Sequence, residues 1–361
     1  MLLESLHVEN FRSLRKLDLE KLGRVNLLLG KNNSGKTSVL EALYALANVE
    51  DPDWIDDLSA QRGLEESVRS FRHIFYQFDQ KNSIAIDGRY AQAPKRVPSS
   101  LGIKLETYDK QRHPSRRNAG PQPELLLTIR LAARSPITIE VARDPRYQSI
   151  DYRPRSEDEE RWLEEGLPEP LQKRNRSLLL QTAVELPLVS EQIEDLTVNK
   201  SQEKLLRVMQ QLDPRIENIA LGSNNQIYLD LGNAFSMLLP VNLMGQGIQR
   251  LLSVVAAMAS LSGGTAFIDE IDNGLHYSAL RVLWQGILAA AKEYDVQVFA
   301  TTHSAEALRH LTAVLDDDQW AEHRDEVAVY TLVRADDDTV RSYRYDYEQL
   351  EFALERDVEI R

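Results

Sequence analysis

The stretch that decides the fold reads Gly30-Lys31-Asn32-Asn33-Ser34-Gly35-Lys36-Thr37. It fits the phosphate-binding pattern G-x-x-x-x-G-K-[ST]. The apolar residues 25–29 before it indicate a buried strand, and residues 37–46 after it indicate the start of a helix. A glycine loop between a strand and a helix lets backbone N–H groups close around phosphate oxygens, and the helix N-terminus adds partial positive charge. The stretch therefore predicts a nucleotide-phosphate site, and its flanks disfavour an ordinary glycine turn.

Two residues at the end of this loop have defined roles in the pattern. Lys36 is expected to reach the β- and γ-phosphates, and Thr37 is expected to bind Mg²⁺. The expected cofactors are therefore ATP and Mg²⁺. The residues predicted to bind the nucleotide here are Asn32, Asn33, Ser34, Gly35, Lys36, Thr37 and Ser38.

Composition limits the class of protein. The chain has 361 residues, of which 42% are hydrophobic and 27% charged, so we expect a packed core in one large or two ordinary domains. It has no cysteine, which excludes disulfides and thiolate metal sites and favours a reducing compartment; we expect a cytoplasmic protein. The first residues lack the pattern of a signal peptide, and no apolar run approaches the roughly 20 residues of a membrane span.

Charge is distributed unevenly along the chain. The net charge is −13, which argues against indiscriminate binding of nucleic acid. Residues 89–155 nevertheless contain 14 Lys and Arg against 6 Asp and Glu, a local excess of +8. This basic segment is a candidate contact surface for DNA or RNA. The alternative is a solvated surface, or one whose cations pair with acidic neighbours.

A second part of the site follows another apolar strand. Residues 265–268 are apolar or β-branched and lead directly into Asp269 and Glu270, the form of a Walker B motif. Asp269 is expected to hold Mg²⁺ through water, and Glu270 to orient and deprotonate the attacking water. The alternative is a strand followed by ordinary surface acids, which the phosphate loop in the same chain disfavours.

A histidine and a pair of glycines add to these motifs. The apolar residues 296–302 predict a strand that ends at His303, on the side where ligands bind in such folds, so His303 is a candidate contact of the γ-phosphate or of the attacking water. Gly245 and Gly247 open the apolar helix 251–261, and glycines at a helix start suit an anion. Gly245 lies 24 residues before Asp269, which leaves room for one helix and a turn.

The remaining pattern predicts the order of the elements. Strands are predicted at residues 2–9, 14–19, 83–89, 101–108, 125–131, 137–141 and 227–231. Helices are predicted at residues 58–78, 177–184 and 201–212. Residues 111–123 indicate a loop, and the charged, proline-containing residues 143–175 indicate an excursion or mobile segment. The two parts of the nucleotide site are far apart in sequence, so we predict an α/β P-loop NTPase core, residues 1–89 and 216–361, split by an inserted α+β segment, residues 90–215.

The order of these motifs resembles that of ABC-type ATPase heads, and above all the AAA/ABC ATPases of the OLD and RecF/SMC group. Residues 6–13 resemble the N-terminal strand motif of that group, residues 268–276 its OLD-type Walker B and D-loop, and residues 301–304 its switch histidine. The resemblance is best over residues 1–50 and 220–310. It implies a head that forms a homodimer around two ATP molecules, with a higher oligomer as a further option.

In such a dimer the signature helix of each head faces the γ-phosphate of the other. The resemblance assigns this contact to the start of the helix, but Met244 stands near the place of the usual signature serine. The contact would therefore use the backbone N–H groups of Gly245 and Gly247, or Gln246. Residues 261–264 spell a familiar ABC signature, but they end only five residues before Asp269, so we interpret them as a helix-to-strand turn.

The glutamine-loop residue of the family is less clearly marked. Gln77 and Gln80 both follow an apolar helical pattern, and we prefer Gln77. The aspartate runs 316–318 and 336–338 look like solvated turns rather than strands of a metal site. With 58 residues after His303, a C-terminal TOPRIM nuclease domain is not expected, and the insertion lacks the long heptad runs of SMC arms.

The first hypothesis is an ATPase whose nucleotide state controls dimer geometry and thereby switches a separate effector. Resemblance to stand-alone members of the group suggests a TOPRIM-type nuclease in bacterial antiphage defence as that effector. The alternative is a RecF-like ATPase of DNA repair or maintenance that binds duplex DNA through residues 89–155. A membrane-transport ATPase fits less well, because residues 6–13 and 272–276 do not look like transporter subunits.

Overall fold

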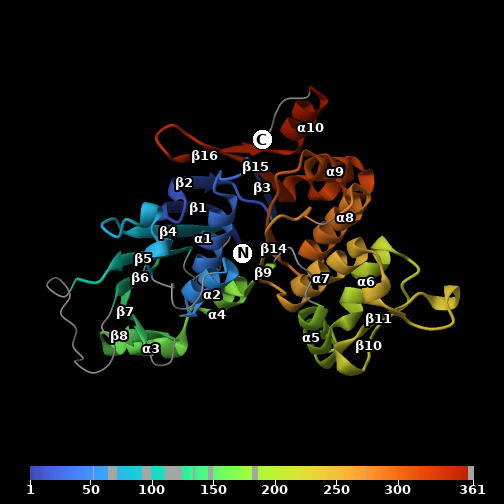
Figure 1. Ribbon diagram of the computed structural model, residues 1–361, viewed down its shortest axis with the longest axis horizontal. Coiled ribbons are helices and arrows are strands. Elements are labelled where there is room, and N and C mark those ends of the chain that lie inside the picture. Colours follow the sequence, from blue (N-terminus) through green and yellow to red (C-terminus); the bar gives the residue numbers. More distant parts are fainter. Residues whose placement is uncertain are drawn as a thin grey trace. The chain divides into compact units, whose positions relative to one another are not determined.

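The computed structural model describes residues 1–51, 53–63, 71–91, 99–109, 124–132, 135–144, 149–180, 186–273 and 275–356. The chain divides into two compact units, each built from separate segments (Figure 1). The first unit comprises Met1–Leu22, Lys31–Arg176 and Leu332–Tyr343, and the second comprises Gly23–Gly30, Ser177–Thr331 and Arg344–Arg361. The predicted loop at residues 111–123 lies outside the described residues.

An antiparallel sheet forms the centre of the first unit. Among the described residues it has seven strands in the order β2-β1-β4-β5-β6-β7-β8. They are β1 (Leu2–Phe11), β2 (Leu14–Glu20), β4 (Ile84–Ala91), β5 (Ser100–Thr107), β6 (Leu125–Leu131), β7 (Ile137–Asp144) and β8 (Ser149–Pro154). Alternation of buried and partly exposed residues is clear on β4, as expected for a sheet with one face on a core. The strands predicted in this region are confirmed.

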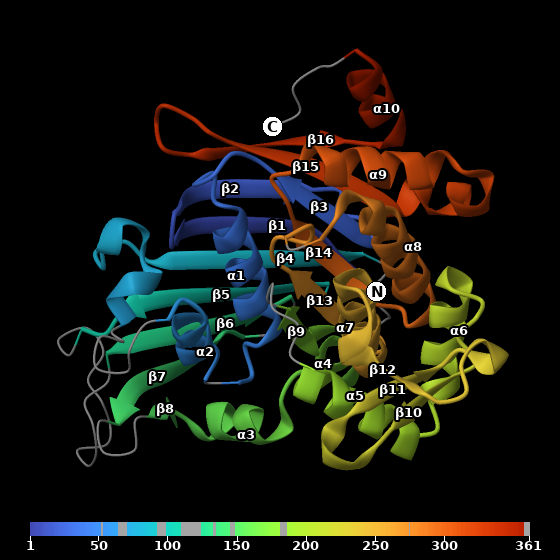
Figure 2. The same cartoon turned by 45° about the vertical axis from the view of Figure 1, so that its right-hand side comes forward.

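Helix α1 (Lys36–Ala47) covers part of this sheet, and Figure 2 shows it in front of the strands. The helix approaches β4 closely, because a Cβ atom on Gly88 would lie 2.6 Å from Leu46 Cδ2. The other described helices of the unit are α2 (Trp54–Gln61), α3 (Glu157–Glu165) and α4 (Glu169–Asn175), with 3₁₀ turns η2 (Phe71–Ile74) and η3 (Tyr76–Phe78).

Two predictions for this unit are wrong. In the described residues the helix predicted at 58–78 is not continuous: α2 ends at Gln61, residues 71–74 and 76–78 form short 3₁₀ turns, and residues 64–70 lie outside the described residues. Tertiary pairing overrides the helical spacing, because the Arg12 N–H donates to the Ile74 carbonyl and Phe11 forms a β-bridge with Phe75. The segment predicted as an excursion, residues 143–175, instead contributes β8 to the seven-stranded sheet as well as α3 and α4, and its residues 145–148 lie outside the described residues.

A parallel sheet forms the centre of the second unit. In the described part of the chain its order is β16-β15-β3-β14-β13-β9, and the neighbours from β15 to β9 run parallel. The strands are β3 (Val25–Leu29), β9 (Ser177–Leu180), β13 (Thr265–Ile268), β14 (Gln297–Thr301), β15 (Val327–Arg334) and β16 (Val340–Tyr345). The unit boundary falls inside β15 and β16. Every residue of β3, β13 and β14 is buried, as expected for parallel strands covered on both faces.

Helices and a small sheet complete the second unit. The helices are α5 (Leu186–Val198), α6 (Gln202–Leu212), α7 (Gln246–Ser260), α8 (Tyr277–Glu293), α9 (Ala305–Asp316) and α10 (Tyr347–Glu355). Strands β10 (Asn218–Leu221), β11 (Ile227–Asp230) and β12 (Leu239–Pro240) pair antiparallel, and 3₁₀ turns η4 (Ser223–Asn225), η5 (Gly232–Ala234), η6 (Val241–Leu243) and η7 (Asp318–Glu326) connect elements. The predicted buried helix is α7, and residues 261–264 form the predicted turn into β13.

One helix prediction for the second unit is wrong. Residues 177–180 form β9, which pairs in parallel with β13, and residues 181–185 lie outside the described residues. The four residues are too few to show a period, and their hydrogen-bond partners come from residues 265–268, far along the chain. The unit boundaries also differ from the predicted split at residues 90 and 215, because β5–β8 extend the sheet of β1 while β9 joins that of β13.

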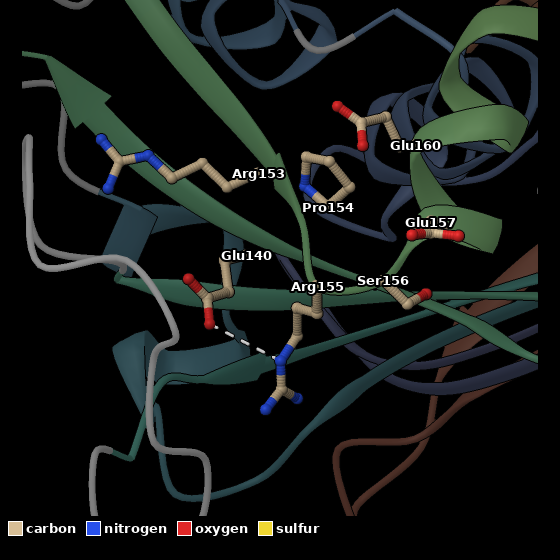
Figure 3. A pocket seen from close by; sticks show the side chains of 7 residues that line it. All are labelled: Glu140, Arg153, Pro154, Arg155, Ser156, Glu157 and Glu160. Carbon is tan, nitrogen blue, oxygen red and sulfur yellow. Dashed lines mark ion pairs between the residues drawn. The ribbon is translucent and has the colours of Figure 1, made fainter.

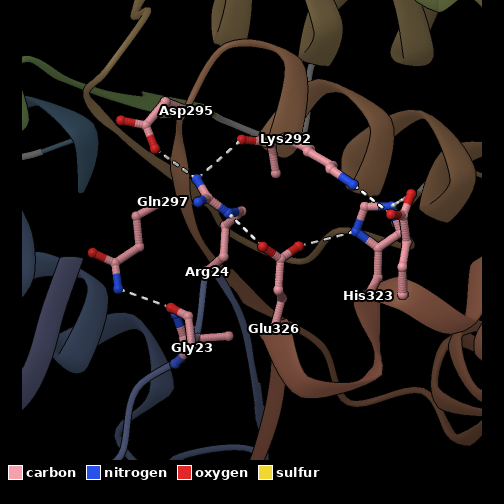
Figure 4. Close-up of polar contacts among 10 residues, drawn as sticks. Gly23, Arg24, Lys292, Asp295, Gln297, His323 and Glu326 are labelled. Carbon is pink, nitrogen blue, oxygen red and sulfur yellow. Dashed lines mark hydrogen bonds and ion pairs between the residues drawn. The ribbon is translucent and has the colours of Figure 1, made fainter. Parts of the chain in front are cut away.

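A polar network fixes the amino-terminal ends of the parallel strands (Figure 4). Arg24, just before β3, pairs with Asp295 at 2.8 Å and with Glu326 at 3.1 Å, and Gln297 Nε2 donates to the Gly23 carbonyl at 2.8 Å. The first residues of β3 and β14 are therefore tied together. The opposite, carboxyl ends carry the predicted site residues.

Candidate functional site

The phosphate loop, residues 30–37, has the backbone that its glycines were expected to provide. It leaves β3 at Gly30, and α1 begins at Lys36 with Gly35 as its N-cap. Gly35 has φ +101°, and a Cβ atom there would lie 2.8 Å from Leu14 Cδ2, so only glycine fits without displacement. Asn33 is also left-handed, with φ +66°.

Several features of this loop fit an anionic ligand. Within the part of the chain that the structure describes, no side chain caps the N-terminus of α1, and the first turn of the helix has no acidic residue. Ser34 Oγ is buried and has no hydrogen-bond partner among the described residues. Lys36 Nζ donates to the Lys31 carbonyl at 3.1 Å, so the cation lies over the loop, and Thr37 is exposed. The donors and charges present are those that a nucleotide phosphate requires.

The carboxylates after β13 are held by the neighbouring strand. Thr301, the last residue of β14, donates its hydroxyl to Asp269 Oδ1 and accepts the Glu270 N–H at 2.8 Å. Glu270 has φ +46°, a left-handed conformation that costs about 1–2 kcal/mol for a residue with a side chain. Asn273 Nδ2 donates to Glu270 Oε2 at 2.9 Å. The two carboxylates are thus fixed in place by hydrogen bonds from the chain itself.

The residues after β14 continue this arrangement. The Thr302 hydroxyl donates to Asp272 Oδ1 and accepts the Ser304 N–H at 2.9 Å. His303 is exposed between these two residues, and Ser304 caps α9. Because β13 and β14 are parallel neighbours, with Ile268 opposite Ala300, the predicted residues Asp269, Glu270 and His303 follow the same edge of the sheet. Thr301 and Thr302 were missed as positioning residues, although their hydroxyls at a strand end were a readable signal.

The start of α7 is open. Gly245 is its N-cap, Gly245 and Gln246 are exposed, and a Cβ atom on Gly245 would meet nothing within 4 Å. Gly247 faces α8 instead, since a Cβ atom there would lie 2.9 Å from the Cβ of Ala279. The Met244 carbonyl accepts from Gln249 Nε2 at 2.8 Å. The two glycines therefore differ in structural role: Gly245 is exposed, whereas Gly247 permits the close packing of α7 and α8.

Gln77 lies in the first unit with a left-handed backbone, φ +48°. Its amide donates to the Tyr76 hydroxyl at 2.8 Å and to Asp338 Oδ2 at 3.4 Å. Gln80 is partly buried, and its carbonyl accepts from Thr107 Oγ1 at 3.0 Å. Of the two glutamines, Gln77 has the more exposed side chain.

A buried ion cluster lies on α1 behind the phosphate loop. Glu41 pairs with Arg62 at 2.6 Å and with Arg12 at 3.4 Å, and the Glu41 and Arg12 side chains are almost fully buried. Burial lowers the pKa of Arg12, while the charge of Glu41 raises it. Arg12 belongs to the N-terminal strand motif, and here its side chain has a structural partner.

Several cations of the basic segment are paired with carboxylates. Arg89 pairs with Glu20 at 3.2 Å, Lys104 with Glu106 at 2.6 Å, Arg130 with Asp87 at 2.7 Å and Arg155 with Glu140 at 3.6 Å. The last pair lies in a pocket at the start of α3, where Glu157 and Glu160 add further acidic groups (Figure 3). For the described part of this segment, pairing with acidic neighbours accounts for these cations.

Comparison with known proteins identifies the family. The family model described as "AAA domain, putative AbiEii toxin, Type IV TA system" matches residues 25–309. The chain belongs to this family. It is an ABC-type AAA ATPase of the RecF/SMC group, and the predicted P-loop NTPase fold is confirmed.

Individual proteins show the same relationship. An "ATP/GTP phosphatase" of Helicobacter pylori is 24% identical over 99% of both chains. The "DNA replication and repair protein RecF" of Clostridioides difficile is 53% identical over 47 residues, which are 13% of each chain.

Solved structures of two SMC heads resemble the whole AAA ATPase chain. One, bound to the C-winged helix domain of ScpA, has a TM-score of 0.53 and 14% identity over 98% of this chain and all of its own. The other, derived from Pyrococcus furiosus, has a TM-score of 0.52 and 12% identity over 99% of both chains. Within the described residues, no helix is both long and apolar enough to cross a bilayer.

Proposed function

We propose that this AAA ATPase hydrolyses ATP with Mg²⁺, and that ATP joins two copies into a dimer that switches a separate effector. The observation that most supports hydrolysis is the fixed pair Asp269 and Glu270 at the end of β13, held by Thr301 and Asn273. An adjacent metal-binding and base carboxylate after a buried strand is the arrangement that ATP hydrolysis requires. The nearly full-length similarity to a protein named ATP/GTP phosphatase supports the same activity.

Each predicted residue then has a chemical role. Residues 32–38 bind phosphate oxygens through backbone N–H groups other than that of Ser34, which donates to the Lys31 carbonyl, and Lys36 contributes positive charge to the β- and γ-phosphates. Thr37 and Asp269 are the residues that would hold Mg²⁺, which when bound neutralises charge on the phosphate oxygens. Glu270 accepts a proton from the attacking water, with its carboxylate oriented by the Asn273 amide. His303 donates a hydrogen bond toward the γ-phosphate or the water.

Dimerisation is proposed for the exposed start of α7. Gly245 and Gln246 are exposed there, and Leu243 next to them is 78% exposed, so an apolar side chain is accessible to a partner surface beside these groups. The Gly245 and Gly247 N–H groups and the Gln246 amide would contact the γ-phosphate held by the partner copy. ATP would then complete the interface, and hydrolysis would release it.

The most specific part of the proposal is the identity of the effector. The resemblance of residues 268–276 to the OLD-type motif supports a TOPRIM-type nuclease encoded separately, acting in antiphage defence. The matched family is described in part as a toxin of a toxin–antitoxin system, which favours a defence role over housekeeping.

The test is Glu270→Gln, with Glu194→Gln on the exposed side of α5 as the matched control. We expect ATP affinity within about twofold of the wild type but hydrolysis lower by about 10²–10⁴-fold, since the general base is lost. ATP should shift Glu270→Gln, measured by light scattering after size exclusion, toward twice the monomer mass. Normal phosphate release by Glu270→Gln would refute the assignment of the base.

A RecF-like, DNA-binding ATPase is the second candidate, favoured by the short match to RecF. Duplex DNA should then stimulate hydrolysis, and binding should weaken steeply as salt rises. The carboxylate pairing of Arg89, Lys104 and Arg130 weighs against these three side chains as phosphate contacts. Hydrolysis indifferent to DNA would favour a protein effector.

A further inference from the structure

An arginine outside every motif contacts the phosphate loop. Arg334 is the last residue of β15, and both it and the loop residue Asn33 belong to the first unit. Its Nε donates to the Asn33 carbonyl at 3.4 Å, its Nη2 to the Ser13 carbonyl at 2.9 Å, and its Nη1 to Asp338 Oδ1 at 2.8 Å. All three guanidinium nitrogens are thus used.

The contact at Asn33 bears on the geometry of the loop. In a trans peptide the C=O and the following N–H lie in one plane and point in opposite directions. The Asn33 carbonyl is held by Arg334, and the following N–H, that of Ser34, donates to the Lys31 carbonyl at 3.1 Å. Both ends of this peptide are therefore fixed, immediately beside Gly35. Asn33 is left-handed, a conformation that asparagine adopts more readily than most residues, and the bond from Arg334 helps to hold it.

Arg334 also contacts the turn between β1 and β2. That turn is joined to α1, because Ser13 Oγ and Ser38 Oγ lie 2.8 Å apart. Through one side chain, the phosphate loop, the β1–β2 turn and the first turn of α1 become a single connected structure. Arginine suits this position because its planar fork directs several donors at once, whereas lysine is a single point of charge.

The third partner, Asp338, extends the connection to the candidate glutamine loop. Asp338 Oδ2 accepts from the Tyr76 hydroxyl and, at 3.4 Å, from Gln77 Nε2. The hairpin tip that carries Asp338 is closed by the Ala335 N–H bonding to the Thr339 carbonyl at 2.9 Å, and Arg15 donates to the Asp337 carbonyl at 2.6 Å.

We infer that Arg334 is a positioning residue of the nucleotide site: it holds the Asn33–Ser34 peptide in its phosphate-binding conformation and couples it, through Asp338, to Tyr76 and Gln77. This inference rests on the proposed function, since it requires the loop to bind nucleotide. Arg334 does not touch the nucleotide in this role. It lowers the cost of binding by ordering the loop in advance.

The experiment compares Arg334→Ala with Arg341→Ala, an exposed arginine on the same hairpin. Affinity for a fluorescent ATP analogue and steady-state hydrolysis are measured on the full chain. For Arg334→Ala we expect the Kd and KM for ATP to rise about 10-fold, with kcat at saturating ATP within about twofold, since Glu270 is untouched. Arg341→Ala should match the wild type. A purely structural role would not separate KM from kcat.

Two milder variants keep the inference testable if Arg334→Ala fails to fold. Arg334→Lys retains the charge but not the fork, and Tyr76→Phe removes only the hydroxyl bonded to Asp338. We expect ATP affinity to fall about threefold in each. Wild-type affinity in Arg334→Lys and in any folded Arg334→Ala would overturn the inference while leaving the proposed ATPase intact. A wild-type chain that binds no ATP would overturn the proposed function, and this inference with it.

Discussion

The phosphate loop and the carboxylate pair after β13 are positioned by different means. The loop is shaped by its main chain: glycine conformations, the Asn33 carbonyl held by Arg334, and a peptide fixed at both ends. The carboxylates of Asp269 and Glu270 are fixed by side chains, through the hydroxyl of Thr301 and the amide of Asn273. The difference teaches that the predicted site residues are marked by sequence motifs, whereas the groups that hold them in place vary: a carbonyl needs a donor such as Arg334, and a carboxylate needs a hydroxyl or an amide.

Lys36→Ala is the most direct test of the proposal that the phosphate loop, rather than the carboxylate pair, provides most of the ATP affinity. Lost charge-assisted contacts should weaken ATP binding by about 10- to 100-fold, from roughly 1.5–3 kcal/mol. Isothermal titration calorimetry measures the affinity, with Lys204→Ala on the exposed face of α6 as the control. ATP binding equal to that of Lys204→Ala would mean that the loop does not hold the phosphates.

Thr301→Val tests whether the Thr301 hydroxyl orients the carboxylates, because valine has almost the same shape as threonine but no hydroxyl. The variant leaves the Glu270 N–H without its acceptor and Asp269 without its donor. We expect kcat to fall about 10-fold and the free energy of unfolding to fall by about 1–3 kcal/mol, with ATP affinity little changed. Phosphate release and urea unfolding provide the two measurements.

Thr312→Val is the matched control, because it removes a buried hydroxyl bonded to the Leu308 carbonyl within α9. It should affect unfolding but not hydrolysis. If both threonine variants hydrolyse ATP at the wild-type rate, the hydroxyl does not position the carboxylates.

The smallest expected effect is a pH dependence of stability that comes from Asp338, the partner of Arg334 at the tip of the β15–β16 hairpin. Hydrogen bonds from Tyr76, and then from Arg334, hold the pKa of Asp338 below its ordinary value. The folded state therefore binds this proton less readily than the unfolded state, so the stabilisation is present above the unfolded pKa of about 3.9 and is lost as pH falls through the folded pKa.

Urea unfolding of the wild type and Asp338→Asn, at pH values above and below this range, measures the effect. The wild type should be more stable above it, and the difference should shrink below it. Asp336→Asn, an exposed neighbour, should show no such pH dependence. A stability difference that does not vary with pH would show that the Asp338 charge plays no part.

The sequence predicted those parts of the molecule in which local pattern and tertiary structure agree. Residues 25–37 and 265–270 carry a strand, a turn and their site residues in one short stretch, so the expected elements formed there. Residues 177–180 and 71–78 could not be predicted, because β9 depends on a distant parallel partner and η3 on left-handed Gln77 and Phe78. In both regions, tertiary contacts decided the conformation.

The supporting residues were harder to predict than the site itself. Arg334 bonds mainly to backbone carbonyls of residues about 300 positions away, a relation that no spacing records. Asp338 was expected in a solvated turn. The turn is present, but the carboxylate is engaged by Tyr76 and Arg334. Thr301 and Thr302 stood within the quoted switch-histidine motif, and only their acceptors, Asp269 and Asp272, show what they do.

The division of the chain into units has a consequence for its synthesis. The chain passes from one unit to the other five times, once inside the phosphate loop between Gly30 and Lys31. Strand β3 leaves the ribosome among the first 30 residues, yet its partners are residues 298–301 and 327–331. Because such long-range pairing must wait for the last strands, neither unit can be completed on the ribosome before nearly the whole chain has emerged. A truncated message would therefore yield no finished nucleotide site.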